Sequence, residues 1–440
     1  MDKLVIEGGL PLRGSIMASG AKNAALPILI ATLLAPGEHT IENVPELVDV
    51  SFTLSLLGRI GCPSLATEED AELGRLRVDT SRVVYSEAPY DVVRKMRASV
   101  LALGPLLART GHAKVSLPGG CAIGVRPIDQ HLKGLEALGC KFELSGGYVV
   151  GRVEHLKGAE IHLDMPTVTG TENILMAAVL ADGRSTIHNA AREPEIIDLA
   201  QFLRAMGARI EGEGTGTLHV DGVPALKPAR TPHRILPDRI EVGTYLLAGA
   251  ITGGDVTVVG ARADDLAPVL DALRQAGCLV ERTADGVRVA RSGPLRPVSI
   301  ETRPHPGFPT DMQAQWMALM TQAEGGAVIK ETIFENRFMH VAELLRLGAE
   351  VRIDGNTAWV SGPAPLTGAE VMATDLRASA SLVLAGLAAG GQTELLRLYH
   401  LDRGYGRLVE KLQSLGAAVA RVADHVRVAP GSLRAAAAQA

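Results

Sequence analysis

The sequence predicts an α/β protein built from six copies of one unit, and two observations support this prediction. A leucine-rich amphipathic segment ends six times in a Gly-Ala or Gly-Cys step, at successive spacings of 78, 68, 70, 71 and 68 residues. Between these steps an apolar segment, a Gly-containing turn and a short β-branched run recur in the same order. Such self-similarity is the signature of repeat architectures. The six glycines are Gly61, Gly139, Gly207, Gly277, Gly348 and Gly416.

The first element of each repeat is an Ala- and Leu-rich segment that is apolar nearly all round. Such a helix has no polar face to turn toward solvent, so we expect it to be buried. Sheets would then lie outside and helices within. The segments expected to form these helices include residues 24–35, 174–181, 245–251 and 379–389.

The fourth repeat shows the remaining elements most clearly. Asp255–Val259 is a β-branched run that predicts a strand, and residues 266–276 keep a polar face, which predicts an amphipathic helix. Gly277 is the expected stop of that helix, because glycine adopts left-handed geometry without strain. Two more predicted strands, 278–282 and 286–290, complete the repeat.

A stretch rich in Pro and basic residues, between Asp221 and Arg239, separates the third repeat from the fourth. We therefore expect two domains of three repeats each. The first three repeats would form one domain, ending near residue 235, and the last three the other. A cleft between two such domains is the natural place for a ligand site.

Composition limits the class of protein. Of 440 residues 47% are hydrophobic but only 3% aromatic, so the core must consist mainly of aliphatic side chains. A net charge of −5 argues against nucleic acid or an anionic membrane as a partner. Met1-Asp2-Lys3 leads directly into a strand-like run, and no apolar run reaches the roughly 18 residues of a membrane span. The sequence thus predicts a cytoplasmic protein, and it allows a homo-oligomer without indicating one.

The cysteines and histidines follow no metal-binding or redox spacing. The four cysteines form no CxxC pair, and the 12 histidines show no HxxxH or HxH pattern, so we expect no metal. Cys62, Cys140 and Cys278 occupy the helix-stop position where the other repeats have alanine. We expect these three to be small core residues.

The fourth cysteine, Cys121, lies in a loop at residues 118–127 that holds three glycines and a proline at each end. Glycines let backbone N–H groups approach a ligand closely, and Arg126 can lower the pKa of the thiol or bind an anion. Two interpretations of this segment are possible: a loop with a reactive thiol, or a tight turn in which the cysteine is incidental. The second repeat carries its surplus residues around this loop, which favours a functional role.

Charged residues stand at the starts of the apolar helices. Lys22, Arg97 and Arg377 oppose the helix dipole there, which indicates anion ligands rather than surface charges. Asp311 and Asp375 also precede apolar helices, and each is either a simple cap or a functional residue.

Three further arginines, Arg126, Arg337 and Arg403, lie at corresponding loop positions in different repeats. Surface salt bridging is the alternative role for each one alone. Because the planar guanidinium suits carboxylate and phosphate, the whole set of cations predicts a small substrate with several negative charges.

Long motifs follow one another along almost the whole chain, from Leu4 to about Val428. They are SGAKNAALP at 19–27, LPGGCAIGVRP at 117–127, AAREPEIID at 190–198, LPDRIEVGT at 236–244, FPTDMQAQ at 308–315, ETIFENRFMHV at 331–341 and TDLRASASLVLAG at 374–386. In these motifs the chain closely resembles the UDP-N-acetylglucosamine 1-carboxyvinyltransferase family of enolpyruvyl transferases.

The resemblance implies two inside-out α/β barrels of three repeats each, one formed by residues 22–235 and the other by residues 1–21 together with 236–440. It implies transfer of the enolpyruvyl group of phosphoenolpyruvate to the 3-hydroxyl of UDP-N-acetylglucosamine, with release of phosphate and without a cofactor. In this family the reaction is the first committed step of peptidoglycan synthesis. The family's reactive cysteine also implies sensitivity to the epoxide antibiotic fosfomycin.

The resemblance assigns roles to the reacting groups. Cys121 matches the proton donor to C3 of phosphoenolpyruvate, and Asp311 matches the base for the sugar hydroxyl. Asn23 matches a residue that binds the tetrahedral intermediate. Lys22 and Arg403 are implied as catalytic residues as well.

The same resemblance implies the substrate contacts. Lys22, Arg126 and Arg403 would bind the phosphate, and Arg337 and Arg377 the carboxylate. Met165 departs from family members that have lysine there, which places one diphosphate contact in question. The implied UDP-sugar contacts are Arg97, Arg126, Pro127, Ile128, Asp129, Gln130, Met165, Pro166, Thr167, Val168, Asp311 and Ile333.

Two alternatives remain open at this point. A 5-enolpyruvylshikimate-3-phosphate synthase would share the repeats, but its NAGT-type glycine loop is absent from this sequence. A catalytically silent paralogue that binds sugar nucleotide would be expected to lack Cys121, Asp311 or one of the arginines, and all are present.

Overall fold

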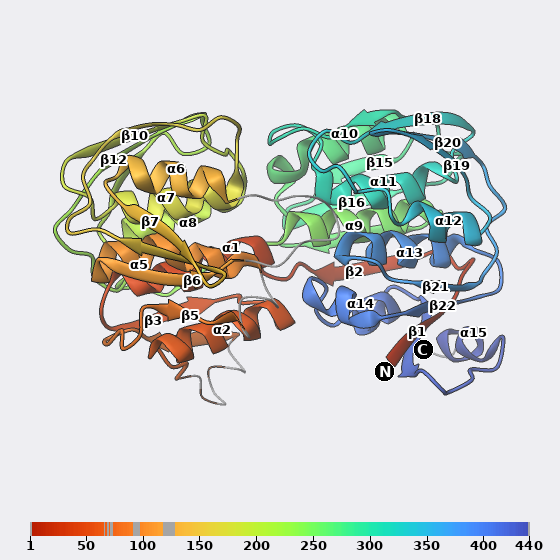
Figure 1. Cartoon of the computed structure of the whole chain (residues 1–440). Coiled ribbons are helices and arrows are strands. Elements are labelled where there is room, and N and C mark those ends of the chain that lie inside the picture. Colours follow the sequence, from red (N-terminus) through yellow and green to blue (C-terminus); the bar gives the residue numbers. More distant parts are fainter. Residues whose placement is uncertain are drawn as a thin grey trace. The chain divides into compact units, whose positions relative to one another are not determined.

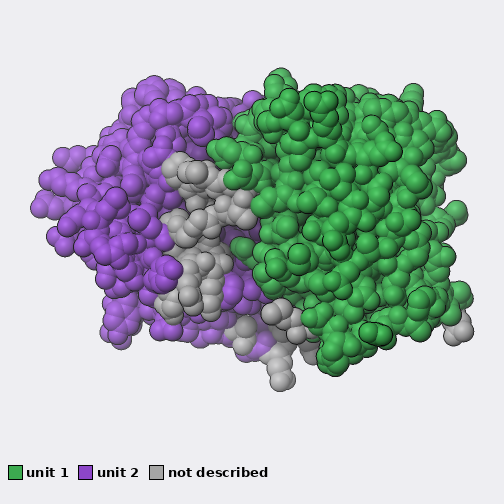
Figure 2. All heavy atoms as spheres, turned by 45° about the vertical axis from the view of Figure 1, so that its right-hand side comes forward, with its two compact units in different colours: residues 1–19, 121–125, 237–440 green, residues 20–120, 126–236 purple. Residues whose placement is uncertain are grey.

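The structure is a computed structural model that describes residues 2–65, 67, 70, 74–90, 97–117 and 128–438, and of Arg97 only the backbone (Figure 1). These residues form two compact units, coloured separately in Figure 2. Unit one holds the described residues up to Ser19 and those from Pro237 onward. Unit two holds the described residues from Gly20 to Leu236. Each unit has its own hydrophobic core.

Small mixed sheets carry the strands of both units, and all of them share one pairing pattern. A central strand pairs in parallel with an edge strand on one side and antiparallel with a third strand on the other. Unit one has three of these sheets. The strand order of the first is β15 (Leu279–Arg282), β16 (Gly286–Ala290), β14 (Asp255–Val259) and β2 (Arg13–Met17), and that of the second is β17 (Ile300–Glu301), β18 (Gly325–Lys330), β20 (Thr357–Gly362) and β19 (Glu350–Asp354). The strand order of the third is β21 (Glu370–Met372), β22 (Gln392–Leu396), β1 (Asp2–Glu7) and β23 (Ala418–Ala423).

Unit two repeats the pattern. Its third sheet has three strands among the described residues, and an isolated bridge between Ser64 and Val78 stands where the fourth would pair. The orders are β5 (Glu87–Ala88), β6 (His112–Ser116), β8 (Tyr148–Arg152), β7 (Lys141–Ser145); β11 (Arg209–Glu211), β12 (Thr217–Asp221), β10 (Arg184–His188), β9 (Glu160–His162); and β13 (His233–Arg234), β3 (Glu38–Glu42), β4 (Arg75–Asp79).

In each unit, strands from the beginning and the end of the chain segment pair with each other and close the unit. In unit one the N-terminal strand β1 lies between β22 and β23, and the next strand, β2, pairs in parallel with β14 of another sheet. In unit two β13 follows the third repeat and pairs in parallel with β3 of the first. Both closures bring together segments that are far apart in the sequence.

Nearly apolar helices form the centre of each unit. In unit one α9 (Arg239–Ile251), α11 (Gln313–Met320) and α13 (Leu376–Ala388) contact one another, and every residue of α11 is buried. In unit two α7 (Val168–Ala178) contacts both α1 (Lys22–Ala31) and α5 (Leu103–Thr110). The short helices beside them are η1 (Thr32–Leu34), η2 (Arg97–Ala102), η3 (Ala263–Leu266), η4 (Thr310–Met312) and η5 (Leu398–Arg403).

The second helix of each repeat keeps an exposed side. These helices are shorter or more polar than the central ones, and the last helix of the chain has no buried residue. They are α2 (Val48–Ile60), α6 (Asp129–Ala137), α8 (Pro194–Ala205), α10 (Ala267–Gln275), α12 (Val341–Arg346) and α14 (Leu408–Ser414), followed by α15 (Ser432–Ala437). Among the described residues no helix combines the length and apolarity needed to cross a membrane.

The strands predicted at 255–259 and 286–290 are confirmed as β14 and β16. The predicted helix starts were too late for the central helices, and α9 shows why. It begins at Arg239 rather than Tyr245, because the Asp238 side chain accepts hydrogen bonds from the N–H groups of Ile240 and Glu241 at 2.9 and 3.1 Å. Its first turn is polar yet buried, so an apolar run alone does not mark where it starts.

The six glycines that mark the repeats all have positive φ, between 88° and 110°. Only glycine takes this conformation without strain, so each amphipathic helix stops at its glycine and the chain turns into the next strand. This confirms the helix-stop role predicted from the sequence.

We predict that Gly207→Ala lowers the free energy of unfolding by about 1–2 kcal/mol, measured by urea denaturation. Gly207 has φ 110° and open space where a Cβ would stand, so the loss would come from backbone strain alone. The matched control is Gly58→Ala in the exposed interior of α2, where a Cβ also meets nothing. That change should stabilise the protein by about 0.5–1 kcal/mol. Equal effects of the two substitutions on the free energy of unfolding would contradict the role of Gly207 as a helix stop that requires positive φ.

Candidate active site

The Asp311 carboxylate of unit one lies between two arginines. Its Oδ1 accepts a hydrogen bond from Nη2 of Arg337 at 2.7 Å, and its Oδ2 accepts one from Nη2 of Arg377 at 2.8 Å. Both arginine side chains are only 5% exposed, whereas that of Asp311 is 26% exposed. A carboxylate that solvent still reaches is thus fixed by two buried cations.

Three separate elements bring these groups together. Asp311 lies in η4 before α11, Arg337 in the turn before α12, and Arg377 in the first turn of α13. The start of α13 is fixed by Asp375, whose carboxylate accepts from the N–H groups of Arg377 and Ala378 at 2.8 and 3.0 Å. Each of these aspartates was expected to be either a helix cap or a functional residue. Asp375 is a cap, whereas Asp311 binds two arginines.

The electrostatics keep Asp311 ionised. Burial by itself would raise the pKa of this carboxyl, but the charges and hydrogen bonds of Arg377 and Arg337 outweigh burial and hold the pKa well below its usual value. His340, at the start of α12, is the opposite case, because burial lowers its pKa to about 4. His340 is therefore neutral at pH 7 and adds no positive charge here.

A buried glutamate supports this arrangement, and the sequence analysis did not single it out. Glu331 follows β18 and accepts hydrogen bonds from the hydroxyls of Thr302 and Thr310 at 2.9 and 2.8 Å. It also accepts from the N–H of Ile333 at 2.8 Å, which shapes the turn that carries Ile333 and leads to Arg337. Thr310 in turn accepts a hydrogen bond from Arg337 at 3.1 Å. The position of Glu331, an acidic residue at the end of an apolar strand, is the sequence feature that could have identified it.

A second set of buried polar side chains contacts Arg377. The Nη1 of Arg377 is 3.5 Å from the Tyr405 hydroxyl, and that hydroxyl is 2.9 Å from the hydroxyl of Thr244. The Gln315 amide donates to the Asp311 carbonyl at 2.9 Å and to Tyr405 at 3.3 Å. This buried set contacts the guanidinium at Nη1, whereas the Asp311 carboxylate contacts it at Nη2. Arg403 ends η5 two residues before Tyr405 and is partly buried.

In unit two the structure brings two predicted sugar-nucleotide segments together. Gln130, in the first turn of α6, donates to the Asp164 carboxylate at 2.8 Å and accepts from the Asp164 N–H at 2.9 Å. The next four residues, 165–168, lead into α7, and Thr167 caps that helix by accepting from the N–H of Gly170 at 3.3 Å. Met165 is 62% exposed. Ile128 and Asp129 precede Gln130 on the same turn.

Lys22 and Asn23 are the first two residues of α1 and are partly buried. The Lys22 ammonium lies 3.5 Å from the carboxylate of Asp49, which is buried in the first turn of α2. Lys22 opposes the dipole of its own helix, as the sequence indicated, because a positive charge stands at the positive end of the helix. No acidic residue in the first turn of α1 offsets that charge. These residues belong to unit two, whereas Asp311, Ile333, Arg337, Arg377 and Arg403 belong to unit one.

Several predicted site residues lie outside the described residues. These are Cys121, Arg126 and Pro127, together with the side chain of Arg97. The other cysteines, Cys62, Cys140 and Cys278, are buried, and burial raises their pKa to about 11, 12 and 11 respectively. The prediction that these three are core residues is confirmed.

The fold and these residues define a class of protein. The structure matches the enolpyruvyl transferase NikO from Streptomyces tendae with a TM-score of 0.86 and 30% identity, over 96% of this chain and 99% of that one. An EPSP synthase from Acinetobacter baumannii matches with a TM-score of 0.74 over 96% of this chain and 100% of that one, but at 18% identity, and so shares the fold alone. Residues 6–412 match the family described as EPSP synthase (3-phosphoshikimate 1-carboxyvinyltransferase).

Closer relatives narrow the class. The UDP-N-acetylglucosamine 1-carboxyvinyltransferase of Anaeromyxobacter dehalogenans is 58% identical over 96% of this chain and 100% of its own length. The enzyme of the same name from Nitratidesulfovibrio vulgaris is 56% identical over 96% of this chain and 100% of its own length. The chain therefore belongs to the EPSP synthase family and, within it, to the UDP-N-acetylglucosamine 1-carboxyvinyltransferases.

We predict that Asp311→Asn lowers the free energy of unfolding by about 2–4 kcal/mol, because it leaves two buried guanidinium groups without their counter-charge. Urea denaturation at neutral pH measures the change. Asp402→Asn is a matched control, since Asp402 pairs with Arg421 at the surface and should change stability by less than about 1 kcal/mol. A change at Asp311 no larger than that of the control would show that the two arginines do not depend on it.

Proposed function

We propose that this protein transfers the enolpyruvyl group of phosphoenolpyruvate to the 3-hydroxyl of UDP-N-acetylglucosamine and releases phosphate, the first committed step of peptidoglycan synthesis. The observation that carries the proposal is the Asp311 carboxylate between Arg337 and Arg377. It supplies an ionised proton acceptor beside two cations suited to a substrate carboxylate. The relatives at 56–58% identity are UDP-N-acetylglucosamine 1-carboxyvinyltransferases, which gives the acceptor and the transferred group of the proposal.

The reaction is an addition followed by an elimination. The sugar oxygen forms a bond to C2 of phosphoenolpyruvate and gives its proton to Asp311, while C3 takes a proton from the Cys121 thiol. In the second step C3 returns a proton to the Cys121 thiolate, the bond between C2 and the phosphate oxygen breaks, and the phosphate leaves with the proton that Asp311 took from the sugar hydroxyl. The double bond between C2 and C3 is restored, and the enolpyruvyl ether remains on the sugar.

Asp311 needs a change of partner to act as a base. A carboxylate whose pKa is held well below the usual value binds a proton weakly. We propose that the carboxylate of phosphoenolpyruvate replaces Asp311 as the partner of Arg337 and Arg377. Asp311 then loses two cationic neighbours and gains an anionic one, so its pKa rises. The base is thus activated only when the substrate that needs it has bound.

The remaining cations serve the phosphate in this proposal. Lys22, Arg126 and Arg403 bind the phosphate oxygens and stabilise the charge that develops as phosphate leaves. The position of Lys22 at the start of α1 adds the positive end of that helix dipole to the field. Asn23, the next residue, binds the tetrahedral intermediate.

The sugar nucleotide is proposed to bind residues of both sequence halves. The link between Gln130 and Asp164 supports this assignment for unit two, because it fixes the 128–130 and 165–168 segments side by side. Exposed Met165 offers an apolar surface where relatives with lysine would offer a charge. Arg97, Arg126 and Pro127 complete the proposed contacts of unit two, and Asp311 and Ile333 those of unit one.

The finer description of the fold belongs to the same proposal. Two inside-out barrels of three repeats, formed by residues 22–235 and by 1–21 with 236–440, are supported by the burial of α9, α11 and α13 at the centre of unit one. The glycine-rich loop around Cys121 would act as a lid. A cytoplasmic location and the expected absence of a cofactor stay predictions from the sequence, which allows a homo-oligomer without indicating one.

The first experiment measures phosphate release from phosphoenolpyruvate with UDP-N-acetylglucosamine and, in parallel, with shikimate 3-phosphate. We expect release with the sugar nucleotide only, and we expect Cys121→Ala to lower turnover by about 10²–10⁴, the usual range for a general acid. The control is Cys140→Ala, which should keep activity because other repeats have alanine at that position.

Each rival has its own outcome. Release with shikimate 3-phosphate would assign the protein to the EPSP synthases, and release with neither, despite binding of the sugar nucleotide, would indicate a silent paralogue. A Cys121→Ala enzyme within about threefold of the wild type would remove the cysteine from its role as acid.

A further inference from the structure

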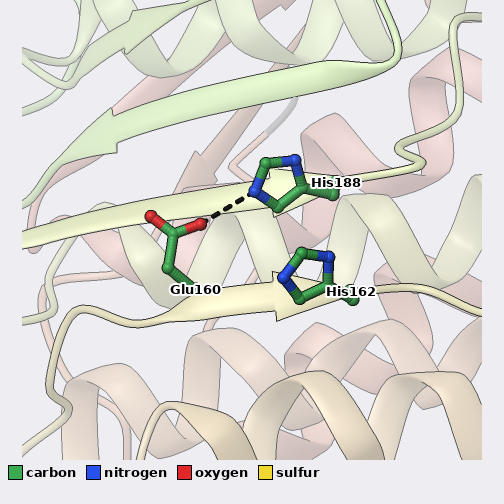
Figure 3. Close-up of side chains that lie close together, drawn as sticks. All are labelled: Glu160, His162 and His188. Atoms are coloured by element: carbon green, nitrogen blue, oxygen red, sulfur yellow. Dashed lines mark hydrogen bonds and ion pairs between the residues drawn. The ribbon is translucent and has the colours of Figure 1, made fainter.

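The outer face of one sheet of unit two holds three side chains that the reaction does not use. Glu160 and His162 lie on the edge strand β9, and His188 ends the central strand β10 (Figure 3). One ligand atom from each, a carboxylate oxygen or an imidazole nitrogen, lies within 4.8 Å of the others. Glu160 and His162 are exposed and His188 is half-buried, so ions in solution can reach them.

The backbone fixes this arrangement. β9 and β10 are parallel neighbours, and the register pairs His162 with His188 and Glu160 with Thr186. The two imidazole rings stack with centroids 4.4 Å apart and planes 5° from parallel. His188 Nε2 lies 2.8 Å from a carboxylate oxygen of Glu160. Figure 3 shows a nitrogen of each ring on the side of Glu160.

The other repeats provide an internal comparison, because the same register position recurs in their sheets. In four of the five other sheets the last residue of the central strand forms either a pair of opposite charges or an apolar pair with the edge strand, and in the fifth the last pair is Ala88 with Val115, one residue before the end of β6. Only β9 and β10, among the described sheets, pair two identical basic groups at this position. The four other pairs are Arg234 with Glu42, Glu301 with Lys330, Met17 with Val259, and Met372 with Leu396.

An imidazole binds a metal ion through the lone pair of one unprotonated ring nitrogen, so each of the two stacked rings can supply one ligand atom. The third ligand atom is a carboxylate oxygen of Glu160, which lies within 4.8 Å of a nitrogen of each ring. The set has the composition of a two-histidine, one-carboxylate site.

We propose that Glu160, His162 and His188 form a surface binding site for a divalent transition-metal ion of the Zn²⁺ class, with water completing the coordination. Zn–N bonds of about 2.0–2.1 Å place two nitrogens on one tetrahedral ion roughly 3.4 Å apart, so small rotations of exposed side chains close the site. Binding replaces the proton that His188 shares with Glu160. The expectation of no metal rested on linear histidine spacing, which cannot detect ligands from two strands.

The test uses the full chain with Cys121→Ser, so that a reactive thiol does not compete for the ion. Zn²⁺ is titrated in competition with a chromophoric chelator. We expect one strong site, weakened at least tenfold by His162→Ala and by His188→Ala, since even outer-shell changes weaken metal sites by about 10–100-fold. His155→Ala, which removes an exposed histidine elsewhere in unit two, should leave the affinity unchanged.

A second readout counts the ligands directly. Electron paramagnetic resonance of bound Cu²⁺ should show superhyperfine coupling to two imidazole nitrogens, and to one after His162→Ala. Thermal unfolding without metal checks that the variants fold, which their surface positions favour. Equal Zn²⁺ affinity in all variants, or a Cu²⁺ spectrum without coupling to two nitrogens, would overturn the proposal and leave the cluster as a surface ion pair beside a stacked ring.

Discussion

The contact between one carboxylate and two buried guanidinium groups is the interaction on which the proposed chemistry depends. Asp311, Arg337 and Arg377 come from three elements of two repeats, and their bonds fix the turn before α12 and the starts of α11 and α13 relative to each other. Removing two cations from water is unfavourable unless a counter-charge stays with them. Asp311 supplies that charge, and under the proposal a substrate carboxylate would supply it in place of Asp311.

The repeat architecture explains why such residues can stand where they do. Each central helix is enclosed by neighbouring helices and sheets along its length, so chemistry is left to its first turn and to the loops that follow strands. Lys22 and Arg377 lie in first turns, and Arg337 and Arg403 lie between a strand and the following helix. The same strand register that builds the sheets also brings His162 beside His188. Function is therefore added at recurring positions of one scaffold.

The sequence predicted the parts of the fold that depend on local pattern. The strands β14 and β16 and the glycine stops were correct because alternation and positive φ act over a few residues. The starts of α9 and α7 were missed because their first turns are polar and become buried only through tertiary contacts. Glu331 and the link from Gln130 to Asp164 depend on partners distant in sequence, which no local pattern reveals.

The most direct measurement is the pKa of Asp311, followed by the ¹³C NMR signal of its carboxyl carbon and assigned with Asp311→Asn. In the free protein we predict no titration down to about pH 4, because an ordinary Asp pKa near 3.9 is lowered by the two arginines. Phosphoenolpyruvate should raise that pKa into the measurable range as its carboxylate takes over Arg337 and Arg377. An unshifted pKa in the free protein, or one that phosphoenolpyruvate leaves unchanged, would contradict substrate activation of the base.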